Sequence, residues 1–186
     1  MLAQFAVRAI AILGLSAAED IGQERSLGEK LVEFCESHKG EQVSTGECSA
    51  LANTGLRTIG AKTRGKDDPN EGDYTWGQPV LVWENTPTGP QATTGRLGGI
   101  RPGDVIQFRD TKWEGPRPGG KGRYSLVLKH HTAIVAEAEN GGQVLKIYQQ
   151  NYGGKKIVMG GTICPRHLKE GWIRIYRPVP ASAKKS

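Results

Sequence analysis

The cysteine in "STGECSALANTGL" (residues 44–56) is the first side chain in the sequence that suggests chemistry. Ser44 and Glu47 match the S-x-x-E capping box of a helix start, so Cys48 lies in the first turn and heads the apolar face. The free N–H groups and the dipole of a helix N-terminus favour a thiolate and can hold an oxyanion during acyl transfer. A buried core cysteine would occupy the same position. Cys48 is therefore a candidate nucleophile that needs partners.

A cysteine nucleophile needs a base, which is usually histidine, and often a polar group that orients the ring. His130 and His131 are the two histidines that lie in a clear strand pattern, "LVLKHHTAIVAEAE". A second strand pattern, "QVLKIYQQNY", follows after "NGG" and predicts a hairpin. Adjacent strand residues point to opposite faces, so the register of this hairpin decides which side chains meet.

The register depends on the length of the turn. A three-residue loop at 140–142 would place Gln149 opposite Ala133 and Asn151 opposite His131, with both amides on the face of His131. A two-residue loop would send both amides to the other face. The candidate site therefore requires the three-residue loop or an equivalently bulged turn.

The motif series "TGECSALA", "RPGDVIQF", "HHTAIVAE" and "IYQQN" resembles that of the CHAP amidases and related papain-like cell-wall cysteine hydrolases. The resemblance covers roughly residues 40 to 155. It implies that Cys48 is the nucleophile, His131 the general base and Asn151 the orienting residue. Gln149 stands where many relatives carry an acidic orienting residue, and it is the second choice for that role. The "RPGD" turn, with Asp104, is interpreted as structural.

The expected fold class is α+β: a papain-like domain with N-terminal helices packed on an antiparallel β-sheet or partly open barrel. The sequence predicts helices at 26–39 and 44–60, a strand or short helix at 80–84, strands at 100–110, in the hairpin and at 171–180, and loops at 61–80, 85–99 and 112–125. The expected single domain spans residues 21–180 and precedes a disordered tail at 181–186. Trp76 and Trp83 could line a cleft, but core packing is the favoured interpretation for both.

The N-terminal segment leaves two interpretations open. Residues 1–20 read either as a signal peptide, ending near residue 18, or as an N-terminal helix. The protein would be secreted or periplasmic in the first case and cytoplasmic in the second. One disulfide, Cys35 to Cys164, is possible if the chain is exported. Cys35 and His38 share a helix face, which favours core packing over a metal pair.

The sequence therefore predicts a cysteine amidase or endopeptidase that cleaves an amide or peptide bond by acyl transfer, in peptidoglycan if the chain is exported. The alternative is a papain-like interaction module with weak or no catalysis. No cofactor and no metal are expected. The net charge of +6 and the pI of about 9.3 suit anionic envelope polymers as partners, beside a peptide or peptidoglycan-like substrate. Nucleic acid ranks last, and a monomer is expected.

Overall fold

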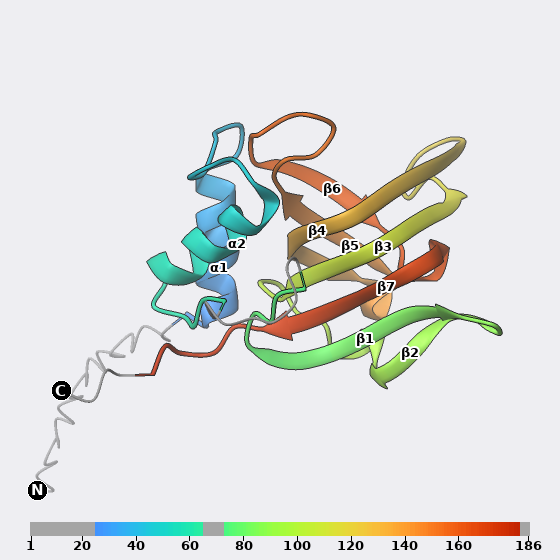
Figure 1. The fold of residues 1–186 in the computed structure, drawn as a ribbon, viewed down its shortest axis with the longest axis horizontal. Helices are drawn as coiled ribbons and strands as arrows, with labels where there is room; N and C mark the ends of the chain where they lie inside the picture. Colours follow the sequence, from blue (N-terminus) through green and yellow to red (C-terminus); the bar gives the residue numbers. More distant parts are fainter. Residues whose placement is uncertain (1–24, 65–72, 183–186) are drawn as a thin grey trace, which may run out of the picture.

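The computed structural model describes residues 25–64 and 73–182. In these parts, seven strands form one antiparallel sheet in the order β2-β1-β7-β3-β4-β5-β6, and two short helices lie at one end of it (Figure 1). The helices are α1 (Leu27–Ser37) and α2 (Cys48–Thr58), and the strands are β1 (Gln78–Thr86), β2 (Gly89–Gly95), β3 (Val105–Pro116), β4 (Arg123–Glu139), β5 (Val144–Gln149), β6 (Met159–Ile163) and β7 (Leu168–Arg177).

The predicted fold class, α+β with N-terminal helices packed on the sheet, is wrong. The described chain is mostly antiparallel sheet, and each helix has only 11 residues. The larger hydrophobic cluster contains no helix residue; it is built by Leu81, Trp83, Ile100, Ile106, Phe108, Trp113, Leu128, Ala133, Val135, Leu145, Ile147, Ile163, Leu168, Ile173 and Ile175. The sheet thus buries most of its apolar surface with its own side chains, and the helices cover one end.

Two segments that were predicted as loops are part of this sheet. Strand β2 lies inside the expected loop 85–99 and pairs with β1. The expected connection 112–125 is mostly strand, because β3 runs on to Pro116 and β4 begins at Arg123. Their glycines and prolines hid this, since such residues usually mark turns. Pairing along a long neighbouring strand overrides that local preference.

The two helices build a second, smaller cluster with the sheet. Leu31 and Phe34 of α1 and Leu51 of α2 pack there with Val105 and Ile134 of the sheet. Helix α1 confirms the prediction for residues 26–39 within a few residues.

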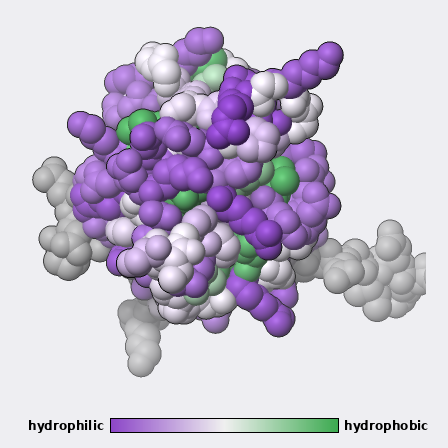
Figure 2. Space-filling view, turned by 90° about the vertical axis from the view of Figure 1, so that its right-hand side faces the viewer, coloured by the Kyte–Doolittle hydropathy of each residue, from purple (hydrophilic) through white to green (hydrophobic). Residues whose placement is uncertain are grey.

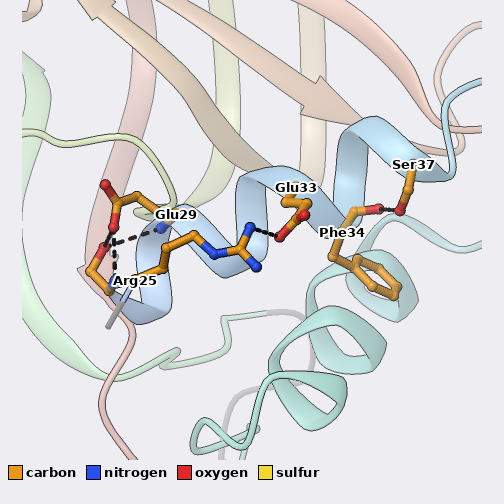
Figure 3. Close-up of polar contacts among 6 residues, drawn as sticks. Arg25, Glu29, Glu33, Phe34 and Ser37 are labelled. Atoms are coloured by element: carbon orange, nitrogen blue, oxygen red, sulfur yellow. Dashed lines mark hydrogen bonds and ion pairs between the residues drawn. The ribbon is translucent and has the colours of Figure 1, made fainter. Parts of the chain in front are cut away.

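A capping box fixes the start of α1, as Figure 3 shows. The Ser26 hydroxyl accepts a hydrogen bond from the Glu29 amide at 3.2 Å, and the Glu29 carboxylate accepts one from the Ser26 amide at 2.7 Å. The same view shows the ion pair between Arg25, which precedes the helix, and Glu33, which lies one turn beyond Glu29.

The "RPGD" turn is structural. Gly103 has a φ of 82°, and a Cβ there would lie 2.2 Å from the Cα of Gly28 in α1, so only glycine allows the helix to approach. Asp104 is buried and accepts two hydrogen bonds from Arg177, at 3.0 and 2.9 Å. The turn therefore locks α1 and β7 onto the start of β3.

No helix among the described residues is long and apolar enough to span a membrane. The signal peptide or helix expected at 1–20 and residues 183–186 of the expected tail lie outside the described residues.

Candidate active site

Cys48 is the first residue of α2, whereas the sequence predicted a helix start at Ser44 with Cys48 in the first turn. Glu47 is the N-cap and makes no side-chain cap hydrogen bond, and Ser44 has a φ of 54° outside the helix, so the predicted capping box is wrong. The buried side-chain amide of Gln150 fixes the segment before α2 instead. It accepts from the Val43 amide at 2.8 Å and donates to the carbonyls of Val43 and Glu47 at 3.1 and 3.0 Å.

The Cys48 thiol is half-buried between α2 and β4. Burial raises its pKa, and the backbone amides of Thr132 and Ser49 together with the Thr132 hydroxyl lower it. The Glu47 carboxylate raises it further. The helix N-terminus therefore supplies one N–H group, that of Ser49, to the sulfur and β4 supplies another, while burial and the neighbouring acid oppose ionisation.

His131 lies in β4 with its ring buried against Phe108, at 5.7 Å between ring centroids. Its Nε2 lies 2.9 Å from Oε1 of Gln149. An amide oxygen only accepts, so Nε2 carries the proton and Nδ1 keeps a lone pair. Burial lowers the pKa of His131, and the Gln149 hydrogen bond raises it in part. The imidazole is thus oriented and held in its neutral form, as a general base requires.

The hairpin register that brings His131 to Gln149 is the expected one, but the turn is not. Gln149 pairs with Ala133, as predicted, whereas Glu139 pairs with Val144 and not with Gln143. A shift in register between Val135 and Glu137 restores the expected pairing before the site is reached. The bulge, and not a three-residue loop, therefore places Gln149 opposite Ala133.

Asn151 is not opposite His131. The β4–β5 pairing ends at Gln149, and Asn151 follows in a bend with a φ of 58°. Its side chain donates to the Glu47 carboxylate at 2.7 Å. The structure thus gives the contact with the imidazole to Gln149, the second choice for the orienting role, and places Asn151 at the start of α2.

Cys48 and His131 both lie near the point where β5 leaves β4, but they contact different faces of β4. Thr132 lies one residue beyond the last β4–β5 pair, and its backbone amide and hydroxyl contact the thiol. His131 is the next residue along the strand, with its ring on the side of the larger cluster. Among the described residues no hydrogen bond joins the thiol to the imidazole.

A buried polar network underlies the site, and the sequence analysis missed it. The amide of Gln107 donates to the His131 carbonyl at 3.1 Å and accepts from the Thr132 hydroxyl at 3.2 Å and from Trp76 Nε1 at 3.1 Å. The signal that could have found it is a glutamine inside the apolar run "DVIQF", since a buried amide needs several partners.

The remaining candidates are structural. Cys35 and Cys164 are free, so the disulfide considered for them is wrong. His38 Nδ1 contacts the Phe34 carbonyl at 2.8 Å, and within the described residues no group of His, Cys, Asp and Glu could hold a metal ion. Trp76 and Trp83 are both buried, as the favoured core interpretation predicts.

A cysteine at a helix N-terminus and a histidine in the adjoining strand of an antiparallel sheet are the arrangement of a cysteine proteinase fold. A family model described as "AIM3/BBC1 Cysteine proteinase-fold domain" matches residues 17–185, and the chain belongs to this family.

One curated relative is altered inheritance of mitochondria protein 3 from Debaryomyces hansenii, which is 30% identical over 165 residues. The match covers 88% of this chain but only 17% of that protein. The crystal structure of Ly7917 matches with a TM-score of 0.48 at 19% identity, over 82% of this chain and 63% of that chain. Ly7917 with the hydrolyzing product of MDP gives 0.47, over 81% and 63%. The CHAP resemblance is thus supported at the level of the cysteine proteinase fold and not of a cell-wall amidase.

Proposed function

We propose that this domain is a cysteine hydrolase that cleaves an amide or peptide bond by acyl transfer. The observation that carries the proposal is the contact of the His131 imidazole with Gln149. The next residue in the strand, Thr132, contacts the Cys48 thiol through its backbone amide. Together these contacts give a nucleophile at a helix N-terminus and an oriented neutral base on adjacent elements.

In this mechanism the Cys48 thiol loses its proton to Nδ1 of His131, and the sulfur attacks the carbonyl carbon of the substrate. The C–N bond breaks, and His131 returns the proton to the leaving amine. Water then attacks the thioester with His131 as base, which releases the acid and restores the thiol. Backbone N–H groups at the start of α2 hold the oxyanion in both steps.

Gln149 acts as a positioning residue in this scheme. It fixes the tautomer that leaves Nδ1 free, but it has no charge with which to stabilise the imidazolium. We therefore expect slower turnover than an acidic residue in the same place would give.

The experiment compares Cys48 alkylation by iodoacetamide against pH in wild type, His131→Ala and His130→Ala, with the modified cysteine identified by mass spectrometry. His130 is exposed and contacts Arg109 at 2.6 Å, so its variant is the matched control. In a working pair, wild type and His130→Ala share one pH profile, and His131→Ala loses reactivity at neutral pH. Turnover of fluorogenic peptides is expected to fall by about 10²–10⁴-fold in His131→Ala only.

The second candidate is an interaction module that keeps the fold without turnover. It is favoured by the raised pKa of the Cys48 thiol and by the amide at the orienting position. The same alkylation experiment separates the two functions. A slow Cys48 with the same pH profile in wild type and His131→Ala would exclude the hydrolase and support the module.

A further inference from the structure

A hollow of about 360 Å³ lies next to the candidate site, and Gln149 is one of the residues that line it. Its other walls come from the first half of β4, from β5 and β6, and from the turn between β3 and β4. Gln149 therefore belongs both to this hollow and to the pair with the His131 imidazole. A group bound in the hollow would lie beside the base.

The floor of the hollow is apolar. Leu128, Ile147 and Ile163 line it and are 8%, 2% and 1% exposed. Figure 2, which views the molecule from the right-hand side of Figure 1, shows hydrophilic side chains over most of that face with only small hydrophobic spots. An apolar group of a ligand would therefore bury its surface in the hollow, since that face has no broad hydrophobic patch.

The mouth of the hollow carries a single sign of charge, and Gly160 and Gly161 of β6 are part of its lining. Arg117 is the one charged residue among those that line it, and no carboxylate is present. Tyr124 lines the wall, and burial raises its pKa to about 12, so its hydroxyl stays neutral. An anionic group is therefore favoured at the Arg117 end.

We infer that this hollow takes one large apolar side chain of an extended peptide, and that Arg117 pairs with a carboxylate on the next residue of that peptide. The volume is near the lower end of the roughly 300–1,000 Å³ of small-ligand sites, which suits one or two residues. The inference rests on the proposed function in one respect, that the bound peptide is a substrate.

The test measures peptide binding in Cys48→Ser protein, so that turnover plays no part. The probes are fluorescein-labelled hexapeptides of glycine with an adjacent leucine and glutamate, in both orders, and matched peptides with serine for leucine or glutamine for glutamate. Fluorescence anisotropy is expected to show binding of a leucine–glutamate peptide and at least tenfold weaker binding of both matched peptides. No detectable binding, or equal binding of the serine peptide, would overturn the inference.

Two variants with matched controls locate the binding. Leu126→Trp enlarges a half-buried side chain that lines the hollow, whereas Val127→Trp enlarges the next side chain, which is 60% exposed and lies outside the hollow lining. Arg117→Glu reverses the charge at the mouth, and Arg96→Glu does so at another exposed arginine. We expect Leu126→Trp and Arg117→Glu each to weaken binding at least tenfold and the controls to leave it unchanged. Equal affinity in Leu126→Trp and Val127→Trp would refute the site.

Wild-type cleavage of the bound peptide separates this inference from the proposed function. Binding that Leu126→Trp removes, without cleavage in wild type, supports the hollow and contradicts the hydrolase. Cleavage that Leu126→Trp leaves unchanged supports the hydrolase and overturns the hollow as its substrate site.

Discussion

Replacing Gln149 by glutamate tests the contact with the His131 imidazole, because glutamate has nearly the same shape as glutamine but carries a negative charge. The amide oxygen lies 2.9 Å from Nε2 of His131, so the new carboxylate would contact the same nitrogen. The imidazole is buried, and burial holds its pKa below the ordinary value of 6.5. A carboxylate at this distance favours the imidazolium and opposes that effect.

An opposite charge this close raises a histidine pKa by roughly 1–3 units, and each unit corresponds to about 1.4 kcal/mol. We expect the His131 pKa to move from below 6.5 in wild type to above it in Gln149→Glu. The pH dependence of stability should then reverse. In wild type the unfolded chain binds more protons at His131, so stability falls as the pH drops below about 6.5. In the variant the folded protein binds more, so stability falls as the pH rises through the new pKa.

The assay is an NMR titration of the His131 ring, with urea unfolding at pH 5.5 and pH 8. Gln143→Glu is the control, since Gln143 is exposed next to the same strand. The reasoning is refuted if His131 titrates at the same pH in wild type and in folded Gln149→Glu, because the carboxylate would then not contact the ring.

Three further changes probe the surroundings of the site. Glu47→Gln removes a charge that raises the pKa of Cys48, so iodoacetamide alkylation near pH 7 should become faster; an unchanged rate would contradict this. Arg177→Met leaves the buried Asp104 carboxylate without its cation, so urea unfolding should show a loss of about 3 kcal/mol that Asp104→Asn in the same chain largely restores. Gly161→Val places a Cβ 2.6 Å from the amide nitrogen that lies beside the imidazole contact, so NMR should show altered chemical shifts for that histidine ring, which an unperturbed site would not show.

The parts of the site that follow from short-range pattern could be predicted. A polar run before an apolar helix face places Cys48 at the helix start, and strand alternation with a turn signal pairs Ala133 with Gln149. Both depend on residues within about twenty positions of one another. The predicted pairing of Asn151 with His131 is wrong because it assumed that the strand pairing continues for two more residues, and the structure ends it at Gln149.

The parts that depend on distant segments could not be predicted. The hydrogen bonds of Gln107 with Trp76 and with the His131 carbonyl join three separate segments of the chain, and no local sequence pattern predicts them. The fold class failed for the same reason. Strand β2 contains glycine, proline and threonine, and it is recognisable as a strand only through its partner β1.

The bulge between Val135 and Glu137 separates the hairpin turn from the site. A turn that gained or lost a residue during evolution would ordinarily slip the strand and turn Gln149 away from the histidine. The bulge absorbs one residue of difference between the turn at 140–143 and the pair of Ala133 with Gln149. Deletion of Ala136 would remove the bulge and keep both pairings, so that any later change in the turn would act on Gln149 directly.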